Sequence, residues 1–231
     1  MRDLELVIFD MAGTTIEDRG QVPDAFTAAL AEHGIDLTPA QVRSVRGASK
    51  RQAIRQLIAT GPDGAQRVEE VYTSFCSILA RRYADEGVRP VPGAVPAFRS
   101  LRERGIRVAL NTGFDRGTTD LLLGALGWTA GVVDAVVCGD DVVQGRPMPY
   151  LIYHAMEATG ASRVHAVANV GDTTLDLQAG YNAGVRWNIG VLSGAHDRQA
   201  LERAPHTHLL PSVAELVALW NQPDAGTTRG R

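Results

Sequence analysis

Short runs of β-branched and apolar residues alternate along this chain with longer helix-like stretches. The first run, LELVIFD at residues 4–10, is apolar at nearly every position, which is typical of a parallel strand buried on both faces. Similar runs follow at 106–112, 134–141, 164–172, 187–192 and, more weakly, 207–210. Strands that alternate with helices form parallel sheets through right-handed crossovers. We therefore predict an α/β fold: a doubly wound, Rossmann-like parallel sheet core with an additional helical insertion.

The insertion follows from one interruption of the alternation. Between the first two runs lie about ninety residues with helical patterns and no strand-like run. Within them, TPAQ at 38–41 matches a capping box, which marks the start of a helix. A structureless loop of this length is uncommon in a compact domain. The predicted limits are a core of residues 1–16 and 89–222, an inserted helical cap domain of 17–88, and a flexible tail of 223–231.

The charge balance restricts the partners. With 23 basic and 26 acidic residues, the net charge of -3 gives no reason to expect nucleic acid or an anionic membrane as partner. No apolar run is long enough to span a bilayer, and the N-terminus lacks the apolar region of a signal peptide. Cys76 and Cys138 lie far apart and match no metal-ligand spacing. We expect a cytoplasmic protein that acts on a small molecule.

Polar residues follow four of the predicted strands at the point where each strand ends. They are Asp10 after the first, Thr112 and Gly113 after the second, Arg146 beyond the third, and Asp172 with Asp176 after the fourth. The carboxyl ends of parallel strands share one edge of the sheet, and ligands bind there. Carboxylates are ligands for Mg²⁺, and Thr and Arg hold phosphoryl oxygens. The pattern predicts a phosphoryl site with Mg²⁺, although Asp176 taken alone fits a helix cap equally well.

The sequences around these residues resemble the four motifs of the haloacid dehalogenase superfamily of aspartate-nucleophile phosphotransferases. The matching segments are FDMAGTT (9–15), NTG (111–113), GDDVVQGRPMP (139–149) and VGDTTLD (170–176). Within the superfamily the chain resembles the phosphonatases, or phosphonoacetaldehyde hydrolases, over nearly its full length. This narrower resemblance rests on the Ala-Gly-Thr-Thr run and on arginine, where lysine is usual, in GRP.

The resemblance implies a role for each position. Asp10 would be the nucleophile that forms an aspartyl-phosphate. Asp10, the backbone carbonyl of Ala12 and Asp172 would hold Mg²⁺, with Asp176 supporting the metal ligands from behind. Thr112, Gly113 and Arg146 would bind the phosphoryl oxygens. The helical insertion would be a mobile cap that closes over the substrate, and a homodimer through the cap is possible.

Lys50 is the only lysine among the 23 basic residues. Most phosphatases of this superfamily carry an acid two residues after the nucleophile, which protonates the leaving alkoxide; Ala12 cannot do so. A lysine amine can instead condense with a carbonyl β to phosphorus. The resulting iminium accepts the electron pair of the P–C bond, whereas arginine stays protonated and cannot form it. In the phosphonatases a lysine of the cap domain forms this imine, and Lys50 aligns with the position of that lysine.

Two other functions remain open. In β-phosphoglucomutase-like relatives, a Gly-x-Ser loop followed by a basic residue grips a substrate phosphate. Residues 47–50 fit that pattern too, so the chain could be a phosphatase or phosphomutase acting on a small phosphate ester, with Lys50 binding anions. A binding protein that kept the fold and lost catalysis is a third interpretation, which the intact set of strand-end residues disfavours.

Three positions depart from the phosphonatase pattern. Ala53 stands where the phosphonatases have His, Arg46 where they have Met, and Phe114 where they have Tyr. We expect Arg46 to favour a larger or more anionic substrate than phosphonoacetaldehyde. Its charge would also lower the pKa of Lys50.

Overall fold

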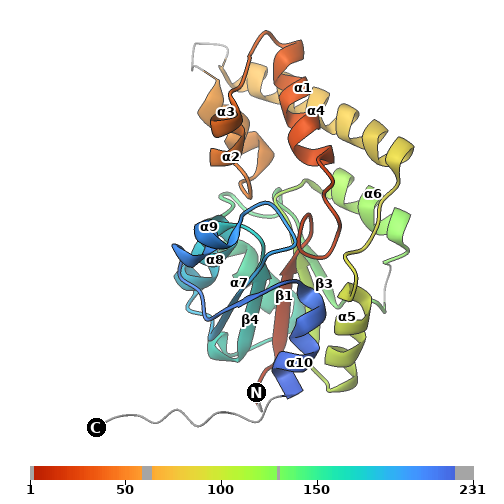
Figure 1. Ribbon diagram of the computed structural model, residues 1–231, viewed down its shortest axis with the longest axis vertical. Helices are drawn as coiled ribbons and strands as arrows, with labels where there is room; N and C mark the ends of the chain where they lie inside the picture. The colour runs from red at the N-terminus through yellow and green to blue at the C-terminus, as the bar shows by residue number, and fades with distance from the viewer. Residues whose placement is uncertain (1–2, 59–63, 129–130, 222–231) are drawn as a thin grey trace.

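A computed structural model describes residues 3–58, 64–128 and 131–221 (Figure 1). Six strands form one sheet: β1 (Leu6–Asp10), β2 (Arg107–Asn111), β3 (Ala135–Val137), β4 (Val167–Gly171), β5 (Trp187–Val191) and β6 (His208–Leu210). Every pairing is parallel, and the order is β3-β2-β1-β4-β5-β6. All six predicted strands are present, and the α/β, Rossmann-like prediction is confirmed. The predicted tail, 223–231, lies outside the described residues.

The central strand β1 is fully buried because helices cover both faces of the sheet. Leu6 and Ile8 pack in one cluster with α7 (Tyr150–Thr159) and α8 (Thr174–Ala183). Val7 and Phe9 point to the other face, against α5 (Ala94–Glu103) and α10 (Leu216–Asn221). Phe98 of α5 makes edge-to-face contacts there with Phe9 and Trp128, at centroid distances of 5.1 and 5.2 Å. The uninterrupted apolar run of β1 thus reflects burial on two sides.

The inserted segment forms four helices above the carboxyl edge of the sheet (Figure 1). They are α1 (Gln21–Glu32), α2 (Pro39–Ser44), α3 (Lys50–Leu57) and α4 (Gly64–Glu86). The longest, α4, packs along α1, and Phe26 meets Phe75 edge to face at 6.0 Å. The predicted capping box is present, since Thr38 N donates to Gln41 Oε1 at 2.9 Å and Gln41 N donates to Thr38 Oγ1 at 3.3 Å.

Two linkers connect these helices to the sheet, and they run side by side. Glu17 N donates to the Arg89 carbonyl and Val91 N donates to the Thr15 carbonyl, both at 2.9 Å. Residues 16 and 90 form an antiparallel bridge. The predicted limits between core and cap fall at this pair of linkers. The division into domains remains our prediction.

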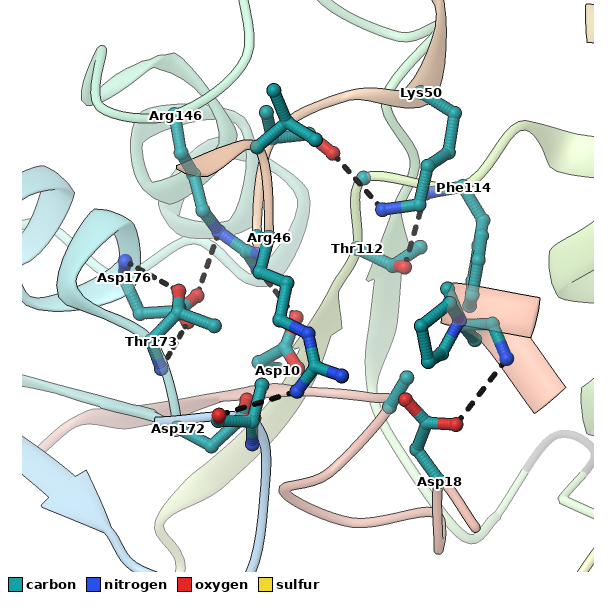
Figure 2. Close-up of a pocket in the computed structure, with 18 of the residues that line it drawn as sticks. Asp10, Asp18, Arg46, Lys50, Thr112, Phe114, Arg146, Asp172, Thr173 and Asp176 are labelled. Atoms are coloured by element: carbon teal, nitrogen blue, oxygen red, sulfur yellow. Dashed lines mark hydrogen bonds and ion pairs between the residues drawn. The ribbon is translucent and has the colours of Figure 1, made fainter. Parts of the chain in front are cut away.

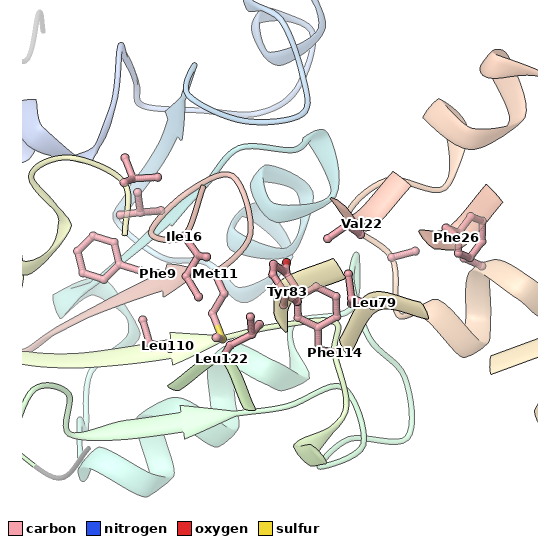
Figure 3. Packing of buried hydrophobic residues seen from close by; sticks show 14 of the residues in the cluster. Phe9, Met11, Ile16, Val22, Phe26, Leu79, Tyr83, Leu110, Phe114 and Leu122 are labelled. Atoms are coloured by element: carbon pink, nitrogen blue, oxygen red, sulfur yellow. The ribbon is translucent and has the colours of Figure 1, made fainter. Parts of the chain in front are cut away.

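Apolar side chains continue from the sheet into the helical segment (Figure 3). Phe9 and Leu110 of the sheet belong to the same buried cluster as Leu79 and Tyr83 of α4, with Phe114 among them. The helical segment therefore rests on the core through a closely packed apolar contact.

Two short helices have no counterpart in the sequence prediction. They are α9 (Arg198–Glu202) and α10, which follows a capping box formed by Ser212 and Glu215. The remaining core helix, α6 (Arg116–Leu126), begins at the N-cap Asp115. None of the helices in the described ranges combines the length and apolarity that a membrane crossing requires.

Replacing Phe98 by Ala is expected to lower the free energy of unfolding by about 3–5 kcal/mol, since a fully buried ring and two ring contacts are lost. Urea denaturation measures this. Leu121→Ala, at a side chain that is 40% exposed on α6, is the control and should cost less than about 1 kcal/mol. Equal losses in the two variants would contradict the packing described here.

Candidate functional site

One cavity of about 70 Å³ lies between the carboxyl edge of the sheet and the helical segment (Figure 2). Every residue that the sequence singled out for catalysis, metal or phosphoryl binding lines it: Asp10, Ala12, Lys50, Thr112, Gly113, Arg146, Asp172 and Asp176. The topology explains the convergence of the seven core residues, because each follows a strand at the same edge. A cavity of this size holds a few water molecules or one small organic anion.

Arg146 is the central charge of the site. Its guanidinium is 3% exposed and makes two ion pairs of 2.8 Å, from Nη2 to Asp10 Oδ1 and from Nε to Asp176 Oδ1. It also donates to the Asn111 carbonyl at 3.2 Å. A buried guanidinium requires such partners, since an unpaired charge would be costly. Arg146 is thereby fixed beside the predicted nucleophile.

Asp176 has both the structural role and the site contact that the sequence left open. Its carboxylate accepts a hydrogen bond from Thr173 N at 3.0 Å and completes the capping box that begins α8. Its other oxygen holds Arg146. Among the described residues its side chain therefore positions the arginine and the helix start.

Asp10 and Asp172 are buried close together. Burial, together with the charge of Asp176, raises the pKa of Asp10 from 3.8 to about 6, although Arg146 opposes this. Burial and the charges of Asp10 and Asp176 raise the pKa of Asp172 well above its ordinary value. Three carboxylates thus share one cation, Arg146, so the site has an excess of negative charge.

The predicted metal ligands fit Mg²⁺ in their chemistry. The Asp172 oxygens accept from Thr14 Oγ1 at 3.1 Å and from Ala195 N at 2.6 Å, which holds the carboxylate still. The carbonyl of Ala12, which lines the cavity, accepts no hydrogen bond from any described residue. In the described ranges no three His, Cys, Asp or Glu side chains gather as a metal site. The predicted set has two carboxylates and one backbone carbonyl, and hard oxygens of this kind suit Mg²⁺.

The loop of residues 45–49 closes the cavity from above. Gly47 has a left-handed backbone (φ +82) and lies so close to Thr173 that a β-carbon there would collide with its side chain. Gly113 lies below the loop in a looser contact, where a β-carbon would meet the Ala48 carbonyl at 3.0 Å. Arg46 Nη1 donates to the Ala195 carbonyl at 3.2 Å. The loop is therefore seated directly on the core.

The seated loop places Lys50 in the cavity at the start of α3. Its Nζ donates to the Ala48 carbonyl at 3.3 Å and lies 5.9 Å from the centroid of the Phe114 ring. Burial lowers the pKa of Lys50 from 10.5 to about 8. Arg146 and Arg46 add to this, and Asp18 and Asp10 oppose it. Arg46 thus contributes as the sequence suggested, but burial is the larger cause.

Asp18, which the sequence analysis missed, also lines the cavity. It lies in the first linker, and its Oδ1 accepts from Gly20 N at 3.1 Å and from Val22 N at 3.3 Å. In sequence it is one acid of the pair Glu17–Asp18, and nothing local shows which of the two faces the cavity.

The comparisons with known proteins identify the family. A family model of haloacid dehalogenase-like hydrolases matches residues 4–184, a range that contains every site residue named above except Ala195. The chain belongs to this family of hydrolases. The superfamily membership that the four motifs predicted is confirmed.

Phosphonatase-like proteins are among its similar relatives. The chain is 28% identical over 229 residues to a phosphonoacetaldehyde hydrolase of Bacteroides fragilis, a match that covers 92% of this chain and 84% of the relative. A phosphonoacetaldehyde hydrolase-like protein of Oleispira antarctica has a solved structure with a TM-score of 0.82 and 26% identity, covering 94% and 91% of the two chains. CbbY of Rhodobacter sphaeroides, solved with xylulose 1,5-bisphosphate, has a TM-score of 0.77 and 21% identity, covering 92% and 96%, and shows the shared fold alone.

Gly47→Ala is expected to abolish or strongly reduce phosphate release, because the added methyl group would prevent the loop from seating against Thr173. Gly34→Ala is the matched control. Gly34 has a similar φ of +73 but open space around it, so both variants carry the backbone strain and only one carries the collision. Similar urea midpoints with activity lost only in Gly47→Ala would support the closure described here; equal activities would contradict it.

The lone lysine allows its pKa to be measured directly. The neutral amine is the reactive form, so its fraction rises with pH through the pKa. Acylation of Lys50 in the folded protein, followed by peptide mapping, should therefore rise with a midpoint near pH 8. The urea-unfolded chain is the control and should follow the ordinary midpoint near 10.5. Coinciding profiles would show that the fold does not perturb this amine.

Proposed function

We propose that this hydrolase is of the phosphonatase type and cleaves the P–C bond of phosphonoacetaldehyde or a related carbonyl phosphonate. One observation carries the proposal: the amine of Lys50 and the carboxylate of Asp10 line the same small cavity, whereas the position two residues after Asp10 holds Ala12, which has no proton to give. A site of this kind has a nucleophile for phosphorus and an amine for a carbonyl, and it lacks the acid that an ester would need.

In the proposed reaction the core residues hold the phosphoryl group. Arg146, Thr112 and the backbone of Gly113 would bind its oxygens, and Asp10 would attack phosphorus to give an aspartyl-phosphate. Asp10, the Ala12 carbonyl and Asp172 would hold Mg²⁺, which when bound supplies charge neutralisation at the phosphoryl oxygens. Asp176 keeps Arg146 in place.

On the cap side, Lys50 would form an imine with the substrate carbonyl. A pKa near 8 leaves a useful fraction of neutral amine close to neutral pH. The protonated imine accepts the electron pair of the P–C bond, which would otherwise remain on a bare carbanion. The seated loop covers this pair of centres on the cap side.

A phosphatase or phosphomutase acting on a small phosphate ester is the second candidate. Arg46 and Lys50 both line the cavity, and neither forms an ion pair with a described carboxylate. Two cations near the substrate would suit a second phosphate, and CbbY was solved with a sugar bisphosphate. In this second function Lys50 binds an anion, and its amine does not react with the substrate.

Lys50→Arg separates the two candidates because arginine keeps the charge and loses the nucleophile. We expect the variant to lose turnover of phosphonoacetaldehyde while its urea midpoint stays unchanged. An anion-binding lysine would instead give a raised KM with kcat largely kept. The measurement is phosphate release at saturating and limiting substrate.

Removing Mg²⁺ with EDTA is expected to stop phosphate release and to leave imine formation at Lys50 intact. The reason is that the predicted metal ligands belong to the core, whereas the amine is held by the cap loop. Borohydride capture, followed by intact-mass spectrometry, reports the imine without turnover. If chelation abolished both phosphate release and the borohydride adduct, imine formation would depend on the metal, which contradicts this expectation.

A further inference from the structure

Imine chemistry requires a group that moves protons beside the lysine, and the cavity offers few. At the positions where the phosphonatases carry His and Tyr, this chain has Ala53 and Phe114, and Ala12 stands where most phosphatases of the superfamily carry an acid. No histidine, cysteine or tyrosine lines the cavity in the described part of the chain. The hydroxyls of Thr112 and Thr173 do not titrate near neutral pH. The proton carrier must therefore be sought among the carboxylates.

Four carboxylates line the cavity, and three of them are committed elsewhere. Asp10 and Asp176 are ion-paired with Arg146, and Asp172 is held by Thr14 and Ala195 among the predicted metal ligands. The fourth is Asp18. It is the carboxylate that stands apart from this cluster: in Figure 2, Asp18, Phe114 and Lys50 lie on one side of the view and Asp172, Thr173 and Asp176 on the other.

Hydrogen bonds from the linker hold one carboxylate oxygen of Asp18 and leave the other oxygen, among the described residues, free to bind a ligand. Oδ1 accepts the backbone N–H groups of Gly20 and Val22, at the start of α1. Its second oxygen accepts no hydrogen bond from any described residue, and its carboxylate forms no ion pair within the described ranges. Asp18 is partly buried and faces the cavity. An anchored carboxylate with one free oxygen is suited to carry a proton to and from a bound ligand.

We propose that Asp18 is the general acid and base for imine formation and hydrolysis at Lys50. The proposal rests on the proposed function, and it assigns to a linker carboxylate the proton transfers for which the cavity has no His or Tyr among the described residues.

The step balances with Asp18 as carrier. Lys50 and Asp18 line the same cavity without forming an ion pair, so a cavity water relays one proton from the Lys50 ammonium to the Asp18 carboxylate. The neutral amine then bonds to the carbonyl carbon as the C=O π pair moves to oxygen. One proton passes from nitrogen to that oxygen, which becomes a hydroxyl. Asp18 returns its proton to the hydroxyl, the C–O bond breaks to release water, and the nitrogen pair forms the C=N bond of the iminium. Hydrolysis of the product imine is the same sequence in reverse.

The charges around Lys50 agree with this assignment. From the linker and the sheet, Asp18 and Asp10 raise its pKa, with Asp18 the larger of the two. From the cap loop and the third motif, Arg46 and Arg146 lower it. On the α4 side, the charge of Asp18 helps to raise the pKa of Tyr83, whose buried hydroxyl has no hydrogen-bond partner among the described residues. Removing the charge of Asp18 should therefore shift the Lys50 titration to lower pH.

The test compares Asp18→Asn with Glu17→Gln. The new amide would keep an oxygen for Gly20 and Val22 and lose only the proton-carrying group, whereas Glu17→Gln makes the same charge change one residue away, outside the cavity. With phosphonoacetaldehyde and borohydride, the rate of adduct formation at Lys50 should fall about 10²–10³-fold in Asp18→Asn and stay unchanged in Glu17→Gln. The rise of the adduct rate with pH, which follows deprotonation of Lys50, should move to lower pH with the Lys50 titration.

The other outcomes are distinct. Equal adduct rates in wild type and Asp18→Asn, with the Lys50 titration shifted, would show that Asp18 is only an electrostatic neighbour and would overturn the proposal while leaving the proposed function intact. No adduct in wild type would overturn the imine mechanism itself, and this assignment with it. Similar urea midpoints for the two variants establish that a lost rate does not come from unfolding.

Discussion

The site depends on how one short loop sits on the core. Residues 45–49 approach the carboxyl edge of the sheet so closely that a β-carbon at Gly47 would collide with Thr173, and one at Gly113 would lie only 3.0 Å from the Ala48 carbonyl. This approach places Lys50 at the start of α3, over Phe114 and within the cavity that Asp10 lines. Without it, the sheet edge would carry a phosphoryl site alone. In the proposed chemistry the phosphoryl group is bound by the sheet edge and the carbonyl group by the helical segment. The loop brings these two parts of the site together.

Burial in this cavity also shifts the pKa values of the site residues. Burial disfavours every ionised group, so it raises the pKa of Asp10 and lowers that of Lys50. For the lysine this is useful, because the neutral amine is the nucleophile. For Asp10 it is a cost that the ion pair with Arg146 offsets in part, and a bound cation beside Asp172 would offset the rest. A site that needs a neutral amine and an ionised carboxylate can bury both in one cavity only if the carboxylate has its own counter-charges.

Much of the site could be predicted from the sequence because of the sheet. In a parallel sheet, the residue after each strand is placed at the same edge, so Asp10, Thr112 and Asp172 could be brought together from the strand pattern alone. Lys50 was found through its rarity. Asp18 could not be found, since its direction depends on how the linker turns beside residues 89–91, about seventy positions away. The fit of Gly47 against Thr173 is likewise a contact between distant segments, and α9 is too short to leave a periodic pattern.

The most direct measurement is the intact mass of the wild-type protein after incubation with phosphonoacetaldehyde and borohydride, with the modified peptide mapped. Capture of an imine predicts an ethyl-sized mass gain on Lys50, absent from the Lys50→Arg protein. An unmodified protein that still releases phosphate from small esters would contradict the P–C cleavage mechanism and leave Lys50 as an anion-binding residue.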